Sequence, residues 1–314
     1  MNISIFRNLY AITSSPYELN NKKNRQIILE ENKKHNFSHY FVCEYNRITI
    51  KKNSIKWNPH IITFIFMKQI STTEWEEYPF AIQNNFNGMQ VRVDIEDNII
   101  ILTSLSNGKK KLFNIYTFIE FLHSFPNLNL SSYFKDTLQY KLTVRYIGQT
   151  EITEDYFRFE NHEKICEISN HLLEYNPQMQ ILIIFDTFQI QQTLITDIKF
   201  LETKEKIKDI PKNIQKNIVE AALINYFKPK FNDKFVNSFP SNKHSSYDYF
   251  YKNALTNIAI EFRNENRAFT IGNENIPYSK SKIINFELFK NDKYDIFPKL
   301  EHNHDLDNFI KLMS

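Results

Sequence analysis

Alternating hydrophobic and polar positions make the first part of the chain rich in predicted strands. The pair Asn107-Gly108 separates two strand-like stretches and is typical of a tight hairpin, in which both central residues have positive φ. A short helix is predicted over residues 116–124. We therefore expect residues 1–130 to form a β-rich region that positions a substrate. The clearest strand patterns cover residues 47–51, 60–69 and 91–103.

The pattern changes between residues 131 and 240, where strand-like and helical stretches alternate. Apolar residues at helical spacing follow a strand that ends at Gly148, and a later helix is stopped by Pro229. The order strand, helix, strand, helix predicts an α/β (α+β) fold with a small central sheet flanked by helices. The expected elements are a strand over 140–147, a helix over 153–175, a strand over 180–185 and a helix over 211–228.

Residues 241–314 are expected to form a C-terminal extension, because a turn-rich stretch at 237–242 precedes them. Three short strands alone are marginally stable, so we expect these strands to pack on the core or on the N-terminal region. The predicted strands cover residues 257–262, 268–271 and 283–289.

Composition narrows the class of protein but not its partner. With 42% hydrophobic residues the chain is not disordered, and its net charge of only +3 barely favours nucleic acid. Its apolar stretches are too short for a membrane span and no secretion signal is visible, so a cytoplasmic protein without a membrane partner is expected. Cys43 and Cys166 have no ligand-like spacing and are expected to be buried thiols.

Chemistry is concentrated between residues 131 and 240. Tyr146 stands at the end of a predicted strand, followed by Ile147 and by one of only 4 glycines in the chain. Arg158 and His162 are four residues apart, so on a helix they share one face and can converge on one point.

Two further polar residues follow on the chain. Glu220 is surrounded by apolar residues on the last predicted helix of this region, and a buried carboxylate needs a partner or a metal ion. Asn232 lies just beyond Pro229, where that helix stops. Taken singly, each of these residues is also compatible with ordinary packing or with a solvated surface.

Tyr-Ile-Gly at a strand end, Arg and His four residues apart, a helical Glu and a following Pro-x-x-Asn together resemble the GIY-YIG nucleases over about residues 139–232. That family includes homing endonucleases, some restriction enzymes and the incision subunit of bacterial excision repair. The resemblance implies that Tyr146 lies near the attacking water, Arg158 holds the scissile phosphate, His162 supports it or relays a proton, Glu220 ligates a metal ion and Asn232 braces the site.

The chain departs from this family at one point. The first half-motif, Gly-Ile-Tyr on a preceding strand, is absent, and Tyr133 and Tyr140 are the candidates to replace its tyrosine.

The other residue types suit phosphodiester hydrolysis. One carboxylate suffices for Mg²⁺ or Mn²⁺, because Mg²⁺ keeps most of its waters, and the arginine fork matches phosphate oxygens. A tyrosine with its ordinary pKa near 10 needs a metal or a cation beside it to act as a base.

The expected function is therefore metal-dependent phosphodiester cleavage, mainly of DNA, in restriction or in defence against foreign DNA. A non-catalytic nucleic-acid-binding or assembly protein and an RNA-directed nuclease or toxin stay open as alternatives, as does an oligomer or a protein partner. Lys109, Lys110 and Lys111 at the hairpin tip and His244 beside the cleft are candidates for nucleic-acid contacts. His302 and His304, near Asp305 and Asp307, are weaker metal candidates.

Overall fold

The computed structural model describes most of the residues of the chain. Within them, each helix is too short or too polar to cross a membrane. The described residues are 2–86, 88–96, 99–124, 140–150, 152, 162–194, 211–239, 257–264, 267–287 and 300–302.

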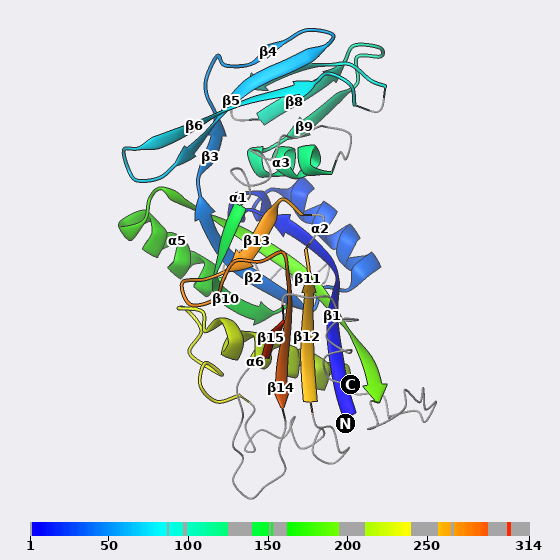
Figure 1. Ribbon diagram of the computed structural model, residues 1–314, viewed down its shortest axis with the longest axis vertical. Helices are drawn as coiled ribbons and strands as arrows, with labels where there is room; N and C mark the ends of the chain where they lie inside the picture. The colour runs from blue at the N-terminus through cyan, green and yellow to red at the C-terminus, as the bar shows by residue number, and fades with distance from the viewer. Residues whose placement is uncertain are drawn as a thin grey trace, which may run out of the picture.

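One eight-stranded sheet, the main sheet, forms the body of the molecule (Figure 1), with the strand order β13-β10-β2-β11-β1-β12-β14-β15. Strands from all three predicted regions share it. The predicted small central sheet flanked by helices is therefore wrong, because the sheet is large and curled and strands dominate the molecule. The strands are β1 (Asn2–Ser14), β2 (His39–Asn46), β10 (Tyr140–Gln149), β11 (Met179–Leu194), β12 (Asn257–Arg263), β13 (Phe269–Gly272), β14 (Ser281–Glu287) and β15 (Leu300–His302).

Strand β2 is the structural centre of the half of the main sheet that carries the motif residues. It pairs antiparallel with β10 on one side and with β11 on the other. All of its residues except Asn46 are buried, as expected for a strand that is covered on both faces. The register sets Tyr40 opposite Gly148 of β10 and opposite Phe185 of β11.

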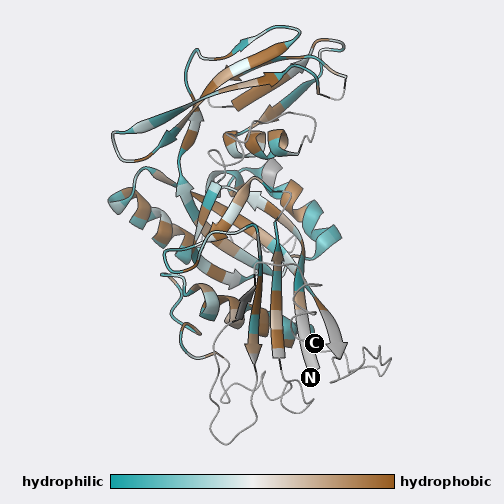
Figure 2. Ribbon diagram, in the orientation of Figure 1, coloured by the Kyte–Doolittle hydropathy of each residue, from teal (hydrophilic) through white to brown (hydrophobic). Residues whose placement is uncertain are grey.

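Helices cover both faces of this part of the sheet. Leu19, Ile28 and Ile168, from α1 (Pro16–Leu19), α2 (Lys22–His35) and α5 (Glu163–Tyr175), pack in one cluster with Tyr40 and Val42, which we call the α5-side core. Buried residues of α6 (Lys212–Phe227) pack on the opposite face in a second cluster, the α6-side core. Figure 2 shows hydrophobic residues along the strands of the main sheet and alternating hydrophobic and hydrophilic residues on α2.

Two predicted helices agree with the structure in type and differ in length. Helix α6 ends at Phe227, where Lys228 takes a left-handed conformation (φ 45°) and Pro229 follows, as the sequence predicts. Helix α5 begins at Glu163 and not near Thr153. His162 caps it with an extended backbone (ψ 108°), so His162 lies before the helix and not on its face.

The chain between β2 and β10 forms the distal module, residues 48–123, which lies at the top of Figure 1. Its core is continuous with the α6-side core. The predicted hairpin is present, but only Gly108 has positive φ (68°), and the Gly108 N–H donates to the Ser104 carbonyl in a longer loop. The module contains β3 (Ile48–Ile50), β4 (Lys56–Trp57), β5 (Ile61–Gln69), β6 (Trp75–Gln83), β7 (Val91–Glu96), β8 (Ile99–Ser104), β9 (Lys110–Phe113) and α3 (Ile115–His123).

Candidate functional site

Three aromatic side chains meet where β2, β10 and the start of α5 come together. The Tyr40 hydroxyl and His162 Nε2 are 2.6 Å apart and share a hydrogen bond. The Tyr146 ring lies 5.8 Å from the Tyr40 ring and 6.1 Å from the His162 ring, between centroids. Tyr40 and His162 are buried and Tyr146 is half-buried, so this cluster borders the surface. We call these three residues the aromatic cluster.

Gly148 is required for the position of Tyr40. A Cβ at Gly148 would lie 2.7 Å from the Tyr40 hydroxyl oxygen and 2.8 Å from two ring carbons. These distances are shorter than van der Waals contact, so any side chain at Gly148 would displace the ring that bonds His162. The glycine of the Tyr-Ile-Gly motif therefore has a steric role against a residue more than a hundred positions earlier in the chain.

Asn232 forms hydrogen bonds with β10 along the edge that β13 leaves unpaired. The N–H of Ile147 donates to Asn232 Oδ1 at 2.9 Å, and Asn232 Nδ2 donates to the Ile147 carbonyl at 2.8 Å. The N–H of Phe231 donates to the Arg145 carbonyl at 3.1 Å. The neighbour strand β13 pairs only with residues 140–143, so the segment after α6 satisfies the backbone groups that β13 leaves unpaired.

Glu220 lies on α6 and contacts the residue that follows the motif. Gln149 Nε2 donates to Glu220 Oε2 and to Asn217 Oδ1, both at 2.8 Å. Glu220 is half-buried. The carboxylate thus stands one residue along β10 from Gly148, on the α6 side of the sheet, whereas the aromatic cluster packs on the α5 side.

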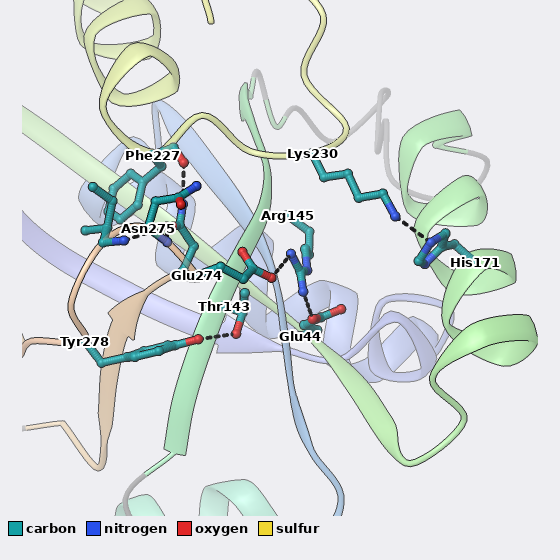
Figure 3. A network of polar contacts seen from close by, with 11 residues as sticks. Glu44, Thr143, Arg145, His171, Phe227, Lys230, Glu274, Asn275 and Tyr278 are labelled. Atoms are coloured by element: carbon teal, nitrogen blue, oxygen red, sulfur yellow. Dashed lines mark hydrogen bonds and ion pairs between the residues drawn. The ribbon is translucent and has the colours of Figure 1, made fainter. Parts of the chain in front are cut away.

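A polar network holds the outer edge of β10 (Figure 3). Arg145 makes ion pairs with Glu44 of β2 and with Glu274, and Thr143 bonds the Tyr278 hydroxyl at 2.6 Å. Burial raises the pKa of Tyr278. Partial burial also acts to raise the pKa of Glu274, but a hydrogen bond with its own backbone and the charge of Arg145 hold that pKa below its ordinary value. These contacts anchor β10 directly beside Tyr146.

Lysine and histidine side chains join α5 to the segment after α6. Lys230 Nζ lies 2.7 Å from His171 Nε2, and Figure 3 shows this contact beside the Arg145 network. Lys164 at the start of α5 reaches the Asp233 carboxylate at 3.7 Å. The start of α5, with His162, is therefore tied to the segment that carries Asn232.

Tyr140 does not belong to the aromatic cluster. A β-bulge between Val144 and Tyr146 shifts the alternation of β10, so Tyr140 enters the α6-side core and Tyr146 the α5 side. Tyr140 is buried against the Tyr45 ring, and burial raises its pKa well above the ordinary value. Tyr140 is a core residue and does not replace the missing tyrosine beside Tyr146.

Several predicted residues lie elsewhere. Lys109, Lys110 and Lys111 are exposed on the β8–β9 hairpin of the distal module, and Lys111 Nζ lies 4.9 Å from the centre of the Phe121 ring. Cys43 is buried as expected, whereas Cys166 is exposed, because it lies on the outer face of α5. Arg158, Tyr133, His244, His304, Asp305 and Asp307 lie outside the described residues.

Two buried ionisable groups lie on neighbouring strands on the α6 side of the sheet. His39 of β2 and Asp186 of β11 are cross-strand neighbours. Burial lowers the pKa of His39 to about 4, and its Nε2 lies 3.0 Å from the Lys216 carbonyl. Burial raises the pKa of Asp186 to about 8, opposed by an Asn8 hydrogen bond. At neutral pH both groups are therefore mostly uncharged.

Glu220 and Asn217 are the residues of this site whose oxygen atoms could hold a hard divalent cation. Glu220 supplies one negative charge and Asn217 an amide oxygen, which are ligands of the kind that Mg²⁺ takes with most of its waters retained. Both of these oxygens accept hydrogen bonds from Gln149 Nε2 in this structure. No three His, Cys, Asp or Glu side chains converge within the described part of the chain. A metal ion here would therefore be held by Glu220 as the single protein carboxylate.

Sequence reasoning missed Tyr40 and Gln149. Nothing in the sequence around Tyr40 resembles a motif, and β2 is separated from β10 by the whole distal module. The aromatic and β-branched residues of 40–45 do predict a strand, and that signal would have made β2 a candidate partner for β10. Gln149 follows the motif directly, and only its contact with Glu220 gives it a role.

Comparison with known proteins identifies no relative: no protein-family model matches the chain, no curated protein matches its sequence and no solved structure matches its fold. No relative therefore assigns a function to the aromatic cluster or to Glu220.

Proposed function

We propose that the chain is a Mg²⁺- or Mn²⁺-dependent endonuclease that hydrolyses phosphodiester bonds, with DNA as the preferred substrate. The observation that supports this most is the position of Tyr40. The Tyr-Ile-Gly motif lacks a second tyrosine in the sequence beside it, and β2 supplies one that contacts both Tyr146 and His162. Two tyrosines and a histidine therefore meet on the α5 side of the sheet, and Glu220, the carboxylate that the resemblance assigns to a metal ion, lies on the α6 side next to Gln149.

Hydrolysis needs a water molecule to attack phosphorus, a proton to leave that water and the departing oxygen to be stabilised. The hydrogen bond between Tyr40 and His162 offers a route on which a proton can be held or passed on. Glu220 would hold a metal ion that neutralises charge on the phosphate. Gln149 orients the Glu220 carboxylate, and Asn232 keeps β10 in register with these groups.

Arg158 is the proposed phosphate contact and is assigned from the sequence alone. A guanidinium fork binds two phosphate oxygens at once, which lysine cannot do. We expect Arg158→Lys to lower activity strongly while leaving the fold intact. This assignment is independent of the described contacts.

The proposal is tested by incubating the purified protein with supercoiled plasmid and Mg²⁺ or Mn²⁺. We expect nicking, and we expect Glu220→Gln and Tyr146→Phe to lower its rate by about 100-fold or more, the usual size of a lost acid–base or charge-stabilising group. Tyr40→Phe should lower it as well. Glu167→Gln is the matched control, because Glu167 is an exposed carboxylate on α5 whose ion pair among the described residues is with Lys164.

The outcomes distinguish the open alternatives. A folded wild-type protein that nicks no plasmid with either metal contradicts the proposal and favours a non-catalytic binding or assembly protein. Nicking that survives Glu220→Gln contradicts the site assignment. Preferential cleavage of RNA in a mixture with DNA identifies the RNA-directed alternative.

A further inference from the structure

A cavity of about 980 Å³ opens between the main body and the distal module, away from the aromatic cluster. Its walls come from α1, α2, the end of β2, the C-terminal half of α5, the start of β8, the end of β9, the start of α3 and the start of β11. This volume lies in the range of small-molecule sites, which favour such junctions. Leu172 of α5 lines it, ten residues along from His162 and hence about 15 Å away along the helix.

The mouth of this cavity carries large hydrophobic side chains that face solvent. Tyr17, Leu173 and Leu112 are 81%, 74% and 62% exposed, and all three line it. Ile27 and Ile99 add to the same lining and are also exposed. Single exposed hydrophobic residues are ordinary, but five from five separate elements around one hollow mark a binding site.

Two residues of the lining, Arg47 and Gln180, offer hydrogen-bond donors to a ligand. Arg47 makes no ion pair with any described residue. Gln180 accepts from the Tyr45 hydroxyl through Oε1 at 3.2 Å, so its Nε2 group is left to donate. The single carboxylate of the lining, Glu18, is already engaged: Oε2 accepts from the Ser15 N–H and Oε1 from Asn114.

We propose that this cavity binds a small amphipathic anion, a molecule with an apolar body and one carboxylate. The apolar body would lie against Leu112, Leu173 and Tyr17, and the carboxylate would accept from Arg47 and Gln180. An arginine fork matches a carboxylate geometrically, and a cationic group in the same place would be repelled by the charge of Arg47. This inference does not depend on nuclease activity.

The test uses 8-anilinonaphthalene-1-sulfonate, an aromatic anion that fluoresces in apolar sites, with the full-length protein. We expect saturable binding and displacement by decanoate at a concentration about tenfold or more below that of 1-decanol, since an ionic contact contributes at least about one tenfold step in affinity. In Arg47→Gln, decanoate should lose that advantage while 1-decanol is unaffected. Leu173→Asp should weaken both.

Matched controls are Arg92→Gln and Ile70→Asp, which change an exposed arginine and an exposed isoleucine that do not line this cavity. Both should bind the dye and decanoate as the wild type does. Equal displacement by decanoate and 1-decanol, or an unchanged response in Arg47→Gln, overturns the proposal. Circular dichroism of each variant shows whether it is folded, and Leu173→Ser replaces Leu173→Asp if that variant unfolds.

Discussion

Single residues in this protein act through partners that are far away in the chain. Tyr40 is the clearest case, because its hydroxyl reaches His162 and its ring occupies the space that Gly148 leaves open. Neither contact can be deduced from the neighbours of these residues in the sequence. At this scale the function of a side chain depends on which strand lies beside it.

Buried ionisable residues make stability depend on pH, and the sign follows from the pKa shifts. The pKa of Asp186 rises from 3.8 to about 8 on folding, so between these values the folded protein holds a proton that the unfolded chain has lost, and stability falls as pH rises. The pKa of His39 falls from 6.5 to about 4, so its contribution rises with pH over that interval. Above pH 6.5, only Asp186 of these two still changes stability.

We therefore predict that the free energy of unfolding falls by roughly 1–2 kcal/mol between pH 6.5 and pH 8. Urea denaturation at several pH values measures it. Asp186→Asn should remove this fall, because the amide does not titrate and can still accept from Asn8. A wild-type stability that stays constant or rises over the same interval would show that Asp186 is ionised when folded.

At the scale of elements, the edge of β10 beyond Thr143 is completed by a loop and not by a strand. The Asn232 side chain presents an acceptor and a donor to Ile147, as a neighbouring peptide group would. The ion pairs of Arg145 with Glu44 and Glu274 hold β10 two residues before Ile147. Side chains therefore hold β10 beside Tyr146, beyond the point where its pairing with β13 ends.

Asn232→Ala should lower the free energy of unfolding by about 1–3 kcal/mol, because it leaves a backbone N–H and a carbonyl of Ile147 without partners. Chemical denaturation measures the loss. Gln83→Ala serves as control, since the exposed Gln83 amide makes no hydrogen bond with the described residues, and it should change stability little. If both variants are equally stable, Asn232 does not support β10.

At the scale of the whole molecule, the main sheet joins the beginning, the middle and the end of the chain. Strand β2 lies between β10 and β11, so these two strands never touch as neighbours. The other edge of β10 pairs with β13, and β1 pairs with both β11 and β12. Residues 131–240 therefore have no continuous sheet of their own.

From this we predict that a fragment of residues 131–240 does not fold, although it contains Tyr146, His162, Glu220 and Asn232. Without β2, strands β10 and β11 expose unpaired backbone and lose the covering of Tyr40. Circular dichroism and limited proteolysis measure this. A fragment with a cooperative unfolding transition would contradict the prediction and support an independent core.

The sequence could predict those elements whose pattern is local. Helices α3 and α6, the β8–β9 hairpin and strands β10, β12 and β14 are close to the expected ranges, because hydrophobic period, Asn-Gly and Pro229 act within a few residues. The start of α5 and the role of Tyr140 were wrong. The start of α5 depends on the extended backbone of His162. The side of the sheet on which Tyr140 lies depends on a bulge that reverses the faces of β10.

By itself, the sequence determined most of the short-range structure and the residue types available for chemistry. Tertiary structure alone decided the size of the sheet, the pairing of β2 with β10 and the choice of Tyr40 over Tyr140 as the neighbour of Tyr146. The physical reason is that helix period and turns depend on neighbouring residues, whereas strand pairing depends on burial and backbone hydrogen bonds between segments of any separation.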